Sequence, residues 1–180
     1  CIIKTTLGTP ALANELRPPG SGQTGSSYTR LVQQVRASLG SLQDKFPDYT
    51  DEAGYEIAGL ILNLGEQDQD PDLYAHYLPI LIADLRKDLQ VQELPVVIVG
   101  TGRGGRIQPD FPRILSAQRA VAALPQFAAT VTWVDTRGFW PSEDARDASR
   151  HPSHERWYDN AESFYRMGNA AAQGLLKLLH

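Results

Sequence analysis

The sequence predicts a three-layer α/β/α sandwich, in which a parallel sheet lies between two layers of helices. Short apolar stretches of strand length alternate along the chain with longer stretches whose apolar residues recur at helical spacing. Strands joined by helix-length connections are typical of parallel sheets. The stretch "LPVVIVG" is apolar on both faces, as expected for a parallel strand that helices cover on each side.

Four strands are expected, at residues 2–7, 56–64, 94–100 and 129–135. The first ends at Gly8 and is followed by a loop rich in proline, glycine and serine. Each of the other three is followed by polar residues. The densest polar cluster is "GEQDQD", directly after "AGLILNL". Open α/β sheets bind ligands at the carboxyl ends of their strands, so we expect a site at this position.

Four helices are expected around this sheet. The first begins near Ser27, a suitable N-cap, the second opens at Pro71 and Asp72 with Pro79 at the position of a kink, and the last begins at about Ala161. Their expected apolar faces, in chain order, are Leu31, Val32, Val35, Leu39 and Leu42; Leu73, Tyr77, Ile80, Leu81 and Leu85; Ile114, Leu115, Ala117, Val121 and Leu124; and Phe164, Met167, Ala171, Leu175 and Leu178.

The composition indicates a single globular domain over residues 1–180. The net charge of -4 argues against a surface for nucleic acid or anionic membrane. No apolar run approaches the roughly 20 residues that a membrane-spanning helix needs. A single cysteine, Cys1, excludes an intrachain disulfide. The 4 histidines do not form a ligand pattern, so we expect no metal and no cofactor.

Several motif-like stretches follow one another in a specific order: "IIKTTLGTPALANELRPPGSG", "AGLILNLGEQD", "YAHYLPILIADLRKDLQVQELPVVIVG", "SAQRAVAALPQFAATVTWVDTRGFW" and "NAESFYRMGNAAAQGL". Together they resemble the sialate O-acetylesterase-like carbohydrate esterases of the SGNH hydrolase superfamily. The resemblance implies a flavodoxin-like sheet and hydrolysis of acylated sugars, with a small-molecule or glycan ester as substrate. It implies a serine nucleophile, a histidine base and an oxyanion hole. An extracellular or periplasmic location is implied by the family alone.

The resemblance places candidate site residues at the ends of the first two strands. Gly8 corresponds to the family glycine whose backbone amide helps to bind the oxyanion. In the block "LNLGEQD", the family pattern is matched by Gly65, Glu66 and Asp68. A solvated turn between a strand and a helix is the alternative interpretation of the two acidic residues.

Other positions depart from the family pattern. Leu64 stands where a glutamine amide is expected, so Asn63 or Gln67 would have to supply that amide instead. The family serine that follows the glycine is here Ala11. Strict register puts Arg156 at the position of the histidine base, and arginine is never deprotonated in proteins. His154 is then the candidate base, reached through a longer loop.

The largest departure is the nucleophile, because no residue of the chain matches the serine of the family's N-terminal block. The corresponding first strand would lie between the strands at 2–7 and 57–63 in the flavodoxin-like order. The resemblance therefore predicts an N-terminally incomplete domain, completed by an upstream segment or a second chain that adds a strand there. Direct hydrogen bonding of Ile3 or Thr5 to residues 59–62 would contradict such an inserted strand.

Two functions remain open at the level of the sequence. One is a carbohydrate acetylesterase, and the other is a non-catalytic relative that binds glycan or has a structural role. We expect Trp133 to lie in the core. Trp140 and Trp157 are left between the core and a surface that stacks on sugars. The glycine-rich stretch "GTGRGGRIQP" lacks the spacing of a nucleotide-binding loop and is interpreted as a strand-to-helix connection.

Overall fold

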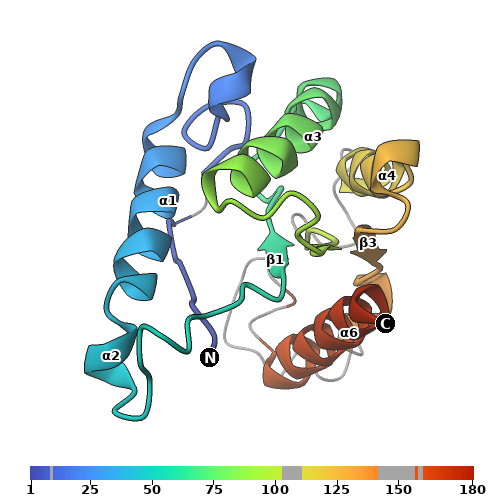
Figure 1. The fold of residues 1–180 in the computed structure, drawn as a ribbon. Coiled ribbons are helices and arrows are strands. Elements are labelled where there is room, and N and C mark those ends of the chain that lie inside the picture. The colour runs from blue at the N-terminus through green and yellow to red at the C-terminus, as the bar shows by residue number, and fades with distance from the viewer. Residues whose placement is uncertain (9, 103–110, 142–156, 158–159) are drawn as a thin grey trace.

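The computed structural model describes residues 1–8, 10–102, 111–141, 157 and 160–180, and within them it contains a three-stranded parallel sheet (Figure 1). The strands are β1 (Leu60–Asn63), β2 (Val96–Val99) and β3 (Val131–Val134), in the spatial order β1-β2-β3. Leu62 pairs with Ile98, and Ile98 pairs with Trp133. The sheet is thus built in sequence order, with β1 at one edge.

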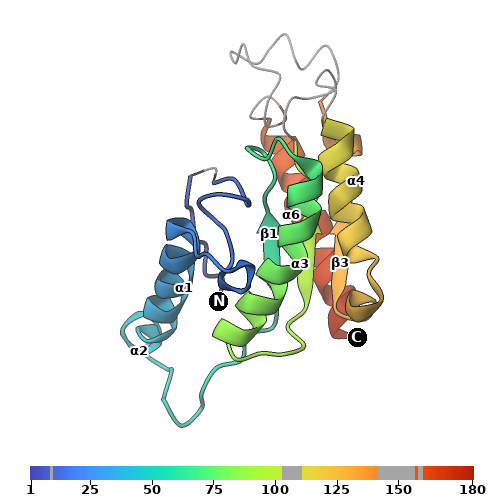
Figure 2. The ribbon, with the colours of Figure 1, turned by 90° about the horizontal axis from the view of Figure 1, so that it is seen from above.

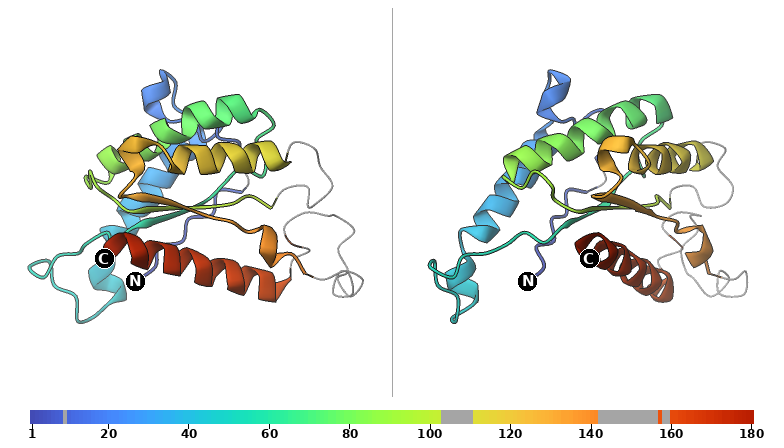
Figure 3. Two further views of the ribbon diagram at one scale, coloured as in Figure 1. Left: turned by 90° about the vertical axis from the view of Figure 1, so that its right-hand side faces the viewer. Right: turned by 45° about the vertical axis from the view of Figure 1, so that its right-hand side comes forward.

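The helices form layers on both faces of this sheet. Those of the described residues are α1 (Ser26–Leu39), α2 (Leu42–Lys45), α3 (Pro71–Asp88), α4 (Phe111–Ala122) and α6 (Ala161–Leu179), with 3₁₀ turns at Pro19–Ser21, Pro125–Phe127 and Arg137–Phe139. The connecting helices α3 and α4 pack together on one face, and α6 packs against β2 and β3 on the other (Figure 3). Successive strands added in one direction require both crossover helices on the same face, because parallel βαβ units have a uniform hand.

The start of α3 follows directly from the local sequence. Asp70 is the N-cap, and its carboxylate accepts hydrogen bonds from the backbone amides of Asp72 (2.9 Å) and Leu73 (3.0 Å). Pro71 occupies the first helical turn, where its missing N–H costs nothing. The polar cluster after β1 therefore ends in a capping signal that fixes where the next helix begins.

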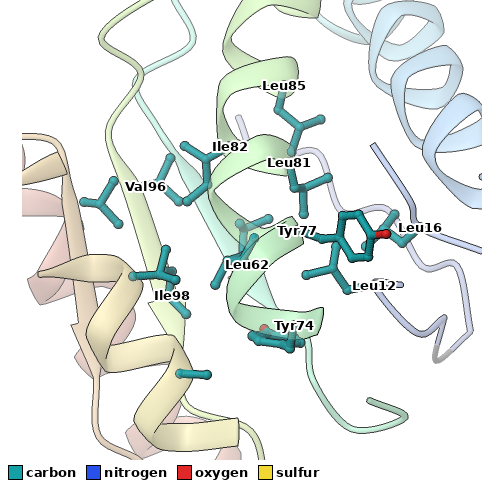
Figure 4. Close-up of a cluster of buried hydrophobic side chains, with 14 of the residues drawn as sticks. Leu12, Leu16, Leu62, Tyr74, Tyr77, Leu81, Ile82, Leu85, Val96 and Ile98 are labelled. Atoms are coloured by element: carbon teal, nitrogen blue, oxygen red, sulfur yellow. The ribbon is translucent and has the colours of Figure 1, made fainter. Parts of the chain in front are cut away.

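The larger core lies between the sheet and the helices α1, α3 and α4. Leu62 and Ile98 point from the strands toward α3, where they pack beside Tyr74 and Leu81 (Figure 4). Leu12, from the loop after the N-terminal segment, is fully buried in the same cluster. This loop is therefore anchored by its apolar side chain as well as by its backbone.

A smaller core lies between the sheet and α6. Val97 and Val99 alternate with the residues that face α3 and pack instead against Met167 and Ala171 of α6. Trp140 and Trp157 complete this cluster, stacked with ring centroids 5.7 Å apart. The two tryptophans left open by the sequence are thus core residues.

The predicted α/β/α fold is confirmed. Three of the four predicted strands are present, each shorter than expected, and α3 and α6 begin at Pro71 and Ala161, as predicted. The predicted N-cap Ser27 is wrong, because α1 begins at Ser26 with Gly25 as its N-cap.

The prediction of a buried position is wrong for two helix residues, since Leu73 is 43% exposed and Phe164 is 39% exposed. The predicted Tyr77, Leu81 and Leu85 of α3 are buried, and Tyr74 and Leu78 are buried beside them.

The predicted strand at residues 2–7 is wrong. These residues form no ladder and are exposed or half-buried, with Ile2 93% exposed. They run between α1 and β1 (Figure 1 and Figure 2), but among the described residues no backbone hydrogen bond joins Ile3 or Thr5 to residues 59–62. A strand exists only through its ladder partners, and this segment has none in the part of the chain that the structure describes.

The second expectation about this edge, an inserted strand beside β1, also finds no counterpart among the described residues. The outer edge of β1 carries no ladder there, and the side chain of Ile61 is 47% exposed. The reason is that α6 packs against β2 and β3 and reaches the β1 side only at its end, where Leu175 lies against Gly59. The stretch "AGLILNL" predicts a strand that is buried on both faces, and the exposure of Ile61 shows that this prediction is wrong.

Candidate functional site

The three strands run parallel, so their carboxyl ends meet along one edge of the sheet. The residues that leave these ends are Leu64 after β1, Thr101 after β2 and Thr136 after β3. Thr101 and Thr136 are fully buried and Leu64 is half-buried. This edge is the one where open α/β sheets bind ligands.

The loop after β1 turns sharply at Gly65. Its φ is +110°, in the region that favours glycine, and a Cβ there would lie 3.2 Å from both Gln118 and Ile114. The loop then alternates in exposure, with Gln67 exposed and Asp68 only 5% exposed. Only some of the polar side chains in this cluster thus face solvent.

Asp68 joins two loops that are distant in the sequence. Its Oδ1 accepts a buried hydrogen bond of 2.8 Å from the backbone amide of Leu12. This contact fixes the loop that follows the N-terminal segment against the loop that follows β1. The geometry gives Asp68 a part in shaping the site, and its burial keeps it away from the solvent-facing edge.

Gln118 of α4 joins the ends of β1 and β2. Its Oε1 accepts from the Thr101 amide (3.1 Å), and its Nε2 donates to the Leu64 carbonyl (2.9 Å) and to the Tyr74 hydroxyl (3.1 Å). Burial raises the pKa of Tyr74 above its usual range, so the hydroxyl stays protonated. The network is therefore neutral.

The end of β3 is organised in a similar way. The Thr136 hydroxyl donates to the Gly100 carbonyl at 3.0 Å, and the Trp157 indole donates to the Thr136 carbonyl at 3.4 Å. Trp157 also packs against Gly102, where a Cβ would lie 2.5 Å from its ring. The ends of β2 and β3 are thus held together from both faces.

The profile of one protein family, described as carbohydrate esterase, sialic acid-specific acetylesterase, matches residues 2–167. The chain belongs to this family. No curated protein and no solved structure matches it. The family model covers the three strands, the loop of Leu12, the loop after β1 and the start of α6 as far as Met167. Membership supports an esterase-like hydrolase that acts on acetylated sugars.

The structure brings some of the esterase-type site residues together and leaves others apart. Gly65 and Asp68 lie in the loop after β1, which hydrogen bonds hold in place. Asn63, the last residue of β1, is exposed. Gly8 lies in the exposed N-terminal segment with a φ of +78°, and a Cβ there would meet nothing within 4 Å. His154 lies outside the described residues.

The remaining predicted positions of the esterase site are Glu66, which is half-buried, and Gln67, which is exposed. Arg156, the alternative to His154, also lies outside the described residues. No group of three His, Cys, Asp or Glu side chains in the described ranges is placed to hold a metal ion. None of the helices in those ranges has the length and apolar character to cross a membrane.

Sequence reasoning missed Gln118 and Leu12. A signal existed for Gln118, because it lies four residues after Ile114 and three before Val121, on the apolar face of its helix. A polar side chain on such a face requires buried partners. The role of Leu12 had no such signal, since it depends on a backbone amide.

Proposed function

We propose that this chain is the larger part of a carbohydrate O-acetylesterase domain, whose substrate is an acetyl ester on a sugar. The observation that carries the proposal is that hydrogen bonds connect the loops at the carboxyl ends of the strands. Asp68 connects the loop of Leu12 to the loop after β1, and Gln118 connects that loop to the end of β2. Hydrolysis of an ester needs preorganised donors around the developing oxyanion, and tied loops supply preorganisation.

The oxyanion side of this site is proposed to include Gly8 and an amide from the loop after β1. Leu64, which replaces the amide of the family pattern, is half-buried and packs against the larger core. Asn63 and Gln67 are exposed on either side of it, so their carboxamides are free to face substrate. In the same proposal His154 is the general base, and Gly65, Glu66 and Asp68 shape the loop.

The nucleophile is proposed to enter with a further strand on the open edge of β1, from an upstream segment of the same polypeptide. Leu60 already donates its amide to Pro95 on the β2 side, so alternate residues such as Ile61 direct their backbone groups outward. Parallel sheets are normally buried on both faces and at their edges, whereas Ile61 is 47% exposed. The added strand would complete one domain with residues 1–180.

The test compares two forms of the protein with a chromogenic acetyl ester. The 180-residue chain alone is expected to show no turnover above background, because it holds no residue that matches the nucleophile. The native polypeptide, identified by intact mass and N-terminal sequencing, is expected to carry an upstream serine and to hydrolyse the ester. A native protein that begins at Cys1, or hydrolysis that depends on a serine of the 180 residues, would overturn the proposed nucleophile.

Two variants then test the oxyanion assignment in the active form. Replacing the contributing amide, by Asn63→Ala or Gln67→Ala, is expected to lower turnover about a hundredfold. Gln69→Ala removes an exposed amide of the same loop and serves as the matched control, with turnover unchanged. Equal activity of all three variants would contradict the assignment. A native protein that binds acetylated sugars without hydrolysing them would favour the non-catalytic relative instead.

A further inference from the structure

Gln118 is a fully buried carboxamide in a helix that otherwise packs apolar side chains against the sheet. A side-chain amide offers one acceptor oxygen and two donor hydrogens. The oxygen is used by the amide of Thr101, and the nitrogen is used by the carbonyl of Leu64 and the hydroxyl of Tyr74. One side chain therefore connects α4, α3 and the ends of two strands.

The two backbone partners of Gln118 lie where the strands become loops. Leu64 directly follows β1, and Thr101 is the second residue after β2. Gly65 turns away at this point with its positive φ, and a Cβ on residue 65 would lie 3.2 Å from the Gln118 nitrogen, a tight contact. The direction in which the loop leaves β1 is thus set against this amide.

We propose that Gln118 is a positioning residue, whose carboxamide holds the Gly65–Asp68 loop at a fixed angle to the end of β2. The importance of this loop for catalysis rests on the proposed function. The positioning itself rests on the three hydrogen bonds and on the close approach at Gly65.

A carboxamide is the side chain that satisfies these partners. The Leu64 carbonyl requires a donor and the Thr101 amide requires an acceptor. Both lie within hydrogen-bonding distance of the same side-chain amide. Methionine has a similar length but would leave both backbone groups unsatisfied. Glutamate would satisfy both while protonated and would place a carboxylate against the Leu64 carbonyl once ionised.

The titratable groups around the amide do not interfere with this comparison. In the described residues, the Tyr74 hydroxyl of α3 accepts a hydrogen bond from the Gln118 amide. The charge of Asp68, in the loop after β1, raises the pKa of Tyr74. Burial and then Asp68 both favour the neutral phenol, so Tyr74 carries no charge over the range of the experiment. A new pH dependence in a glutamate variant would therefore come from the introduced carboxyl.

The experiment measures residue-specific hydrogen exchange by NMR on the 180-residue chain, expressed as protection relative to the intrinsic rate at each pH. Gln118→Met is expected to lower the protection of Thr101 and of the Gly65–Asp68 amides about tenfold at every pH, the effect of one lost buried hydrogen bond. Gln118→Glu is expected to resemble the native protein at low pH and Gln118→Met at high pH. The Leu85 amide in α3 serves as the internal reference.

Two further variants separate positioning from packing. Val121→Ala weakens the same helix by removing core methyl groups, and is expected to lower protection at Leu85 and at the loop by the same factor. Tyr74→Phe removes only the third hydrogen bond and is expected to leave the loop amides unchanged. The inference is overturned if Gln118→Met behaves like Val121→Ala, or if Gln118→Glu shows no pH dependence. Because no substrate is present, these outcomes are independent of whether the protein hydrolyses esters.

Discussion

Asp68 shows how the role of a single carboxylate depends on its burial. In the sequence it stands in a polar cluster at the end of a predicted strand, and this position favours contact with substrate. In the structure it is 5% exposed and accepts the backbone amide of Leu12 at 2.8 Å. A buried carboxylate that accepts a backbone amide organises a loop, because it satisfies a donor that would otherwise be stranded away from water.

We expect Asp68→Ala to lower the free energy of unfolding by about 1–3 kcal/mol, since it leaves the buried Leu12 amide without its acceptor. Asp68→Asn keeps an acceptor oxygen at the same place and should cost less. Urea denaturation measures both values. Gln69→Ala, in the exposed neighbouring position, is the control and should lie within about 0.5 kcal/mol of the native protein. A loss for Gln69→Ala as large as that for Asp68→Ala would contradict the role given to Asp68.

Asp135 and Arg137, after β3, give a second prediction at this scale. The hydrogen bonds from the Arg137 side chain lower the pKa of Asp135, and the Arg137 backbone amide adds to the effect. Because the folded-state pKa lies below that of the unfolded chain, the pair stabilises the fold above the unfolded pKa. This stabilisation is lost as the pH falls through the folded value.

Arg137→Ala should therefore raise the pKa of Asp135 toward its ordinary value, as followed by NMR titration of the carboxyl carbon. Both side chains are partly exposed, so the change in stability at neutral pH should be small. Arg119→Ala removes a more distant charge that also acts on Asp135 and should produce a smaller shift. An Asp135 titration that Arg137→Ala leaves unaltered would rule out this pairing.

Among the contacts between elements, Trp157 lies close against the residues that follow β2. Trp157 is 1% exposed, stacks on Trp140 and makes an edge-to-face contact with Phe164 of α6. A Cβ on Gly102 would lie 2.5 Å from the Trp157 ring, a distance that real side chains do not tolerate. The aromatic cluster therefore depends on the absence of a side chain at this glycine.

Gly102→Ala should displace the Trp157 ring and cost about 1–3 kcal/mol, as overpacked core sites do. Near-ultraviolet circular dichroism should lose intensity, because the stacked indoles would no longer be fixed, and thermal unfolding should move to lower temperature. Gly138→Ala is the matched control, since a Cβ there meets nothing within 4 Å. Identical spectra for the two variants would show that the ring accommodates the methyl group without moving.

For the whole molecule, the outer edge of β1, which pairs with no other strand among the described residues, leads to a prediction about association in solution. An exposed apolar edge strand is a template for pairing with another chain. Ile61 of this strand is exposed, and so is Ile2 in the N-terminal segment that runs between α1 and β1 (Figure 1). We expect the 180-residue chain to self-associate as its concentration rises.

Ile61→Lys should reduce this self-association, measured by sedimentation velocity over a range of concentrations, because a charge on an edge strand opposes pairing. The position is 47% exposed, so the fold should tolerate the lysine. Leu73→Lys makes the same exchange at a 43% exposed position on α3, away from the edge, and should leave the association unchanged. Equal association of both variants with the native chain would place the contact elsewhere.

Features of this fold that depend on near neighbours along the chain follow from the sequence alone. The alternation of apolar stretches predicts β1, β2 and β3, and the Asp70-Pro71 pair predicts the start of α3. Periodicity and capping act over a few residues, so a linear pattern contains all that they need. The order of family-like blocks likewise pointed to the esterase family whose model matches residues 2–167.

Only the tertiary structure decided which segments pair and which polar groups meet. Residues 2–7 resemble a strand in composition but form no ladder, because a strand requires a neighbour at hydrogen-bonding distance. The hydrogen bonds that shape the loops of the candidate site, from Gln118 to Leu64 and from Leu12 to Asp68, span 54 and 56 positions. Such contacts arise when burial forces distant backbone groups to find partners, and no local pattern specifies which partner will be within reach.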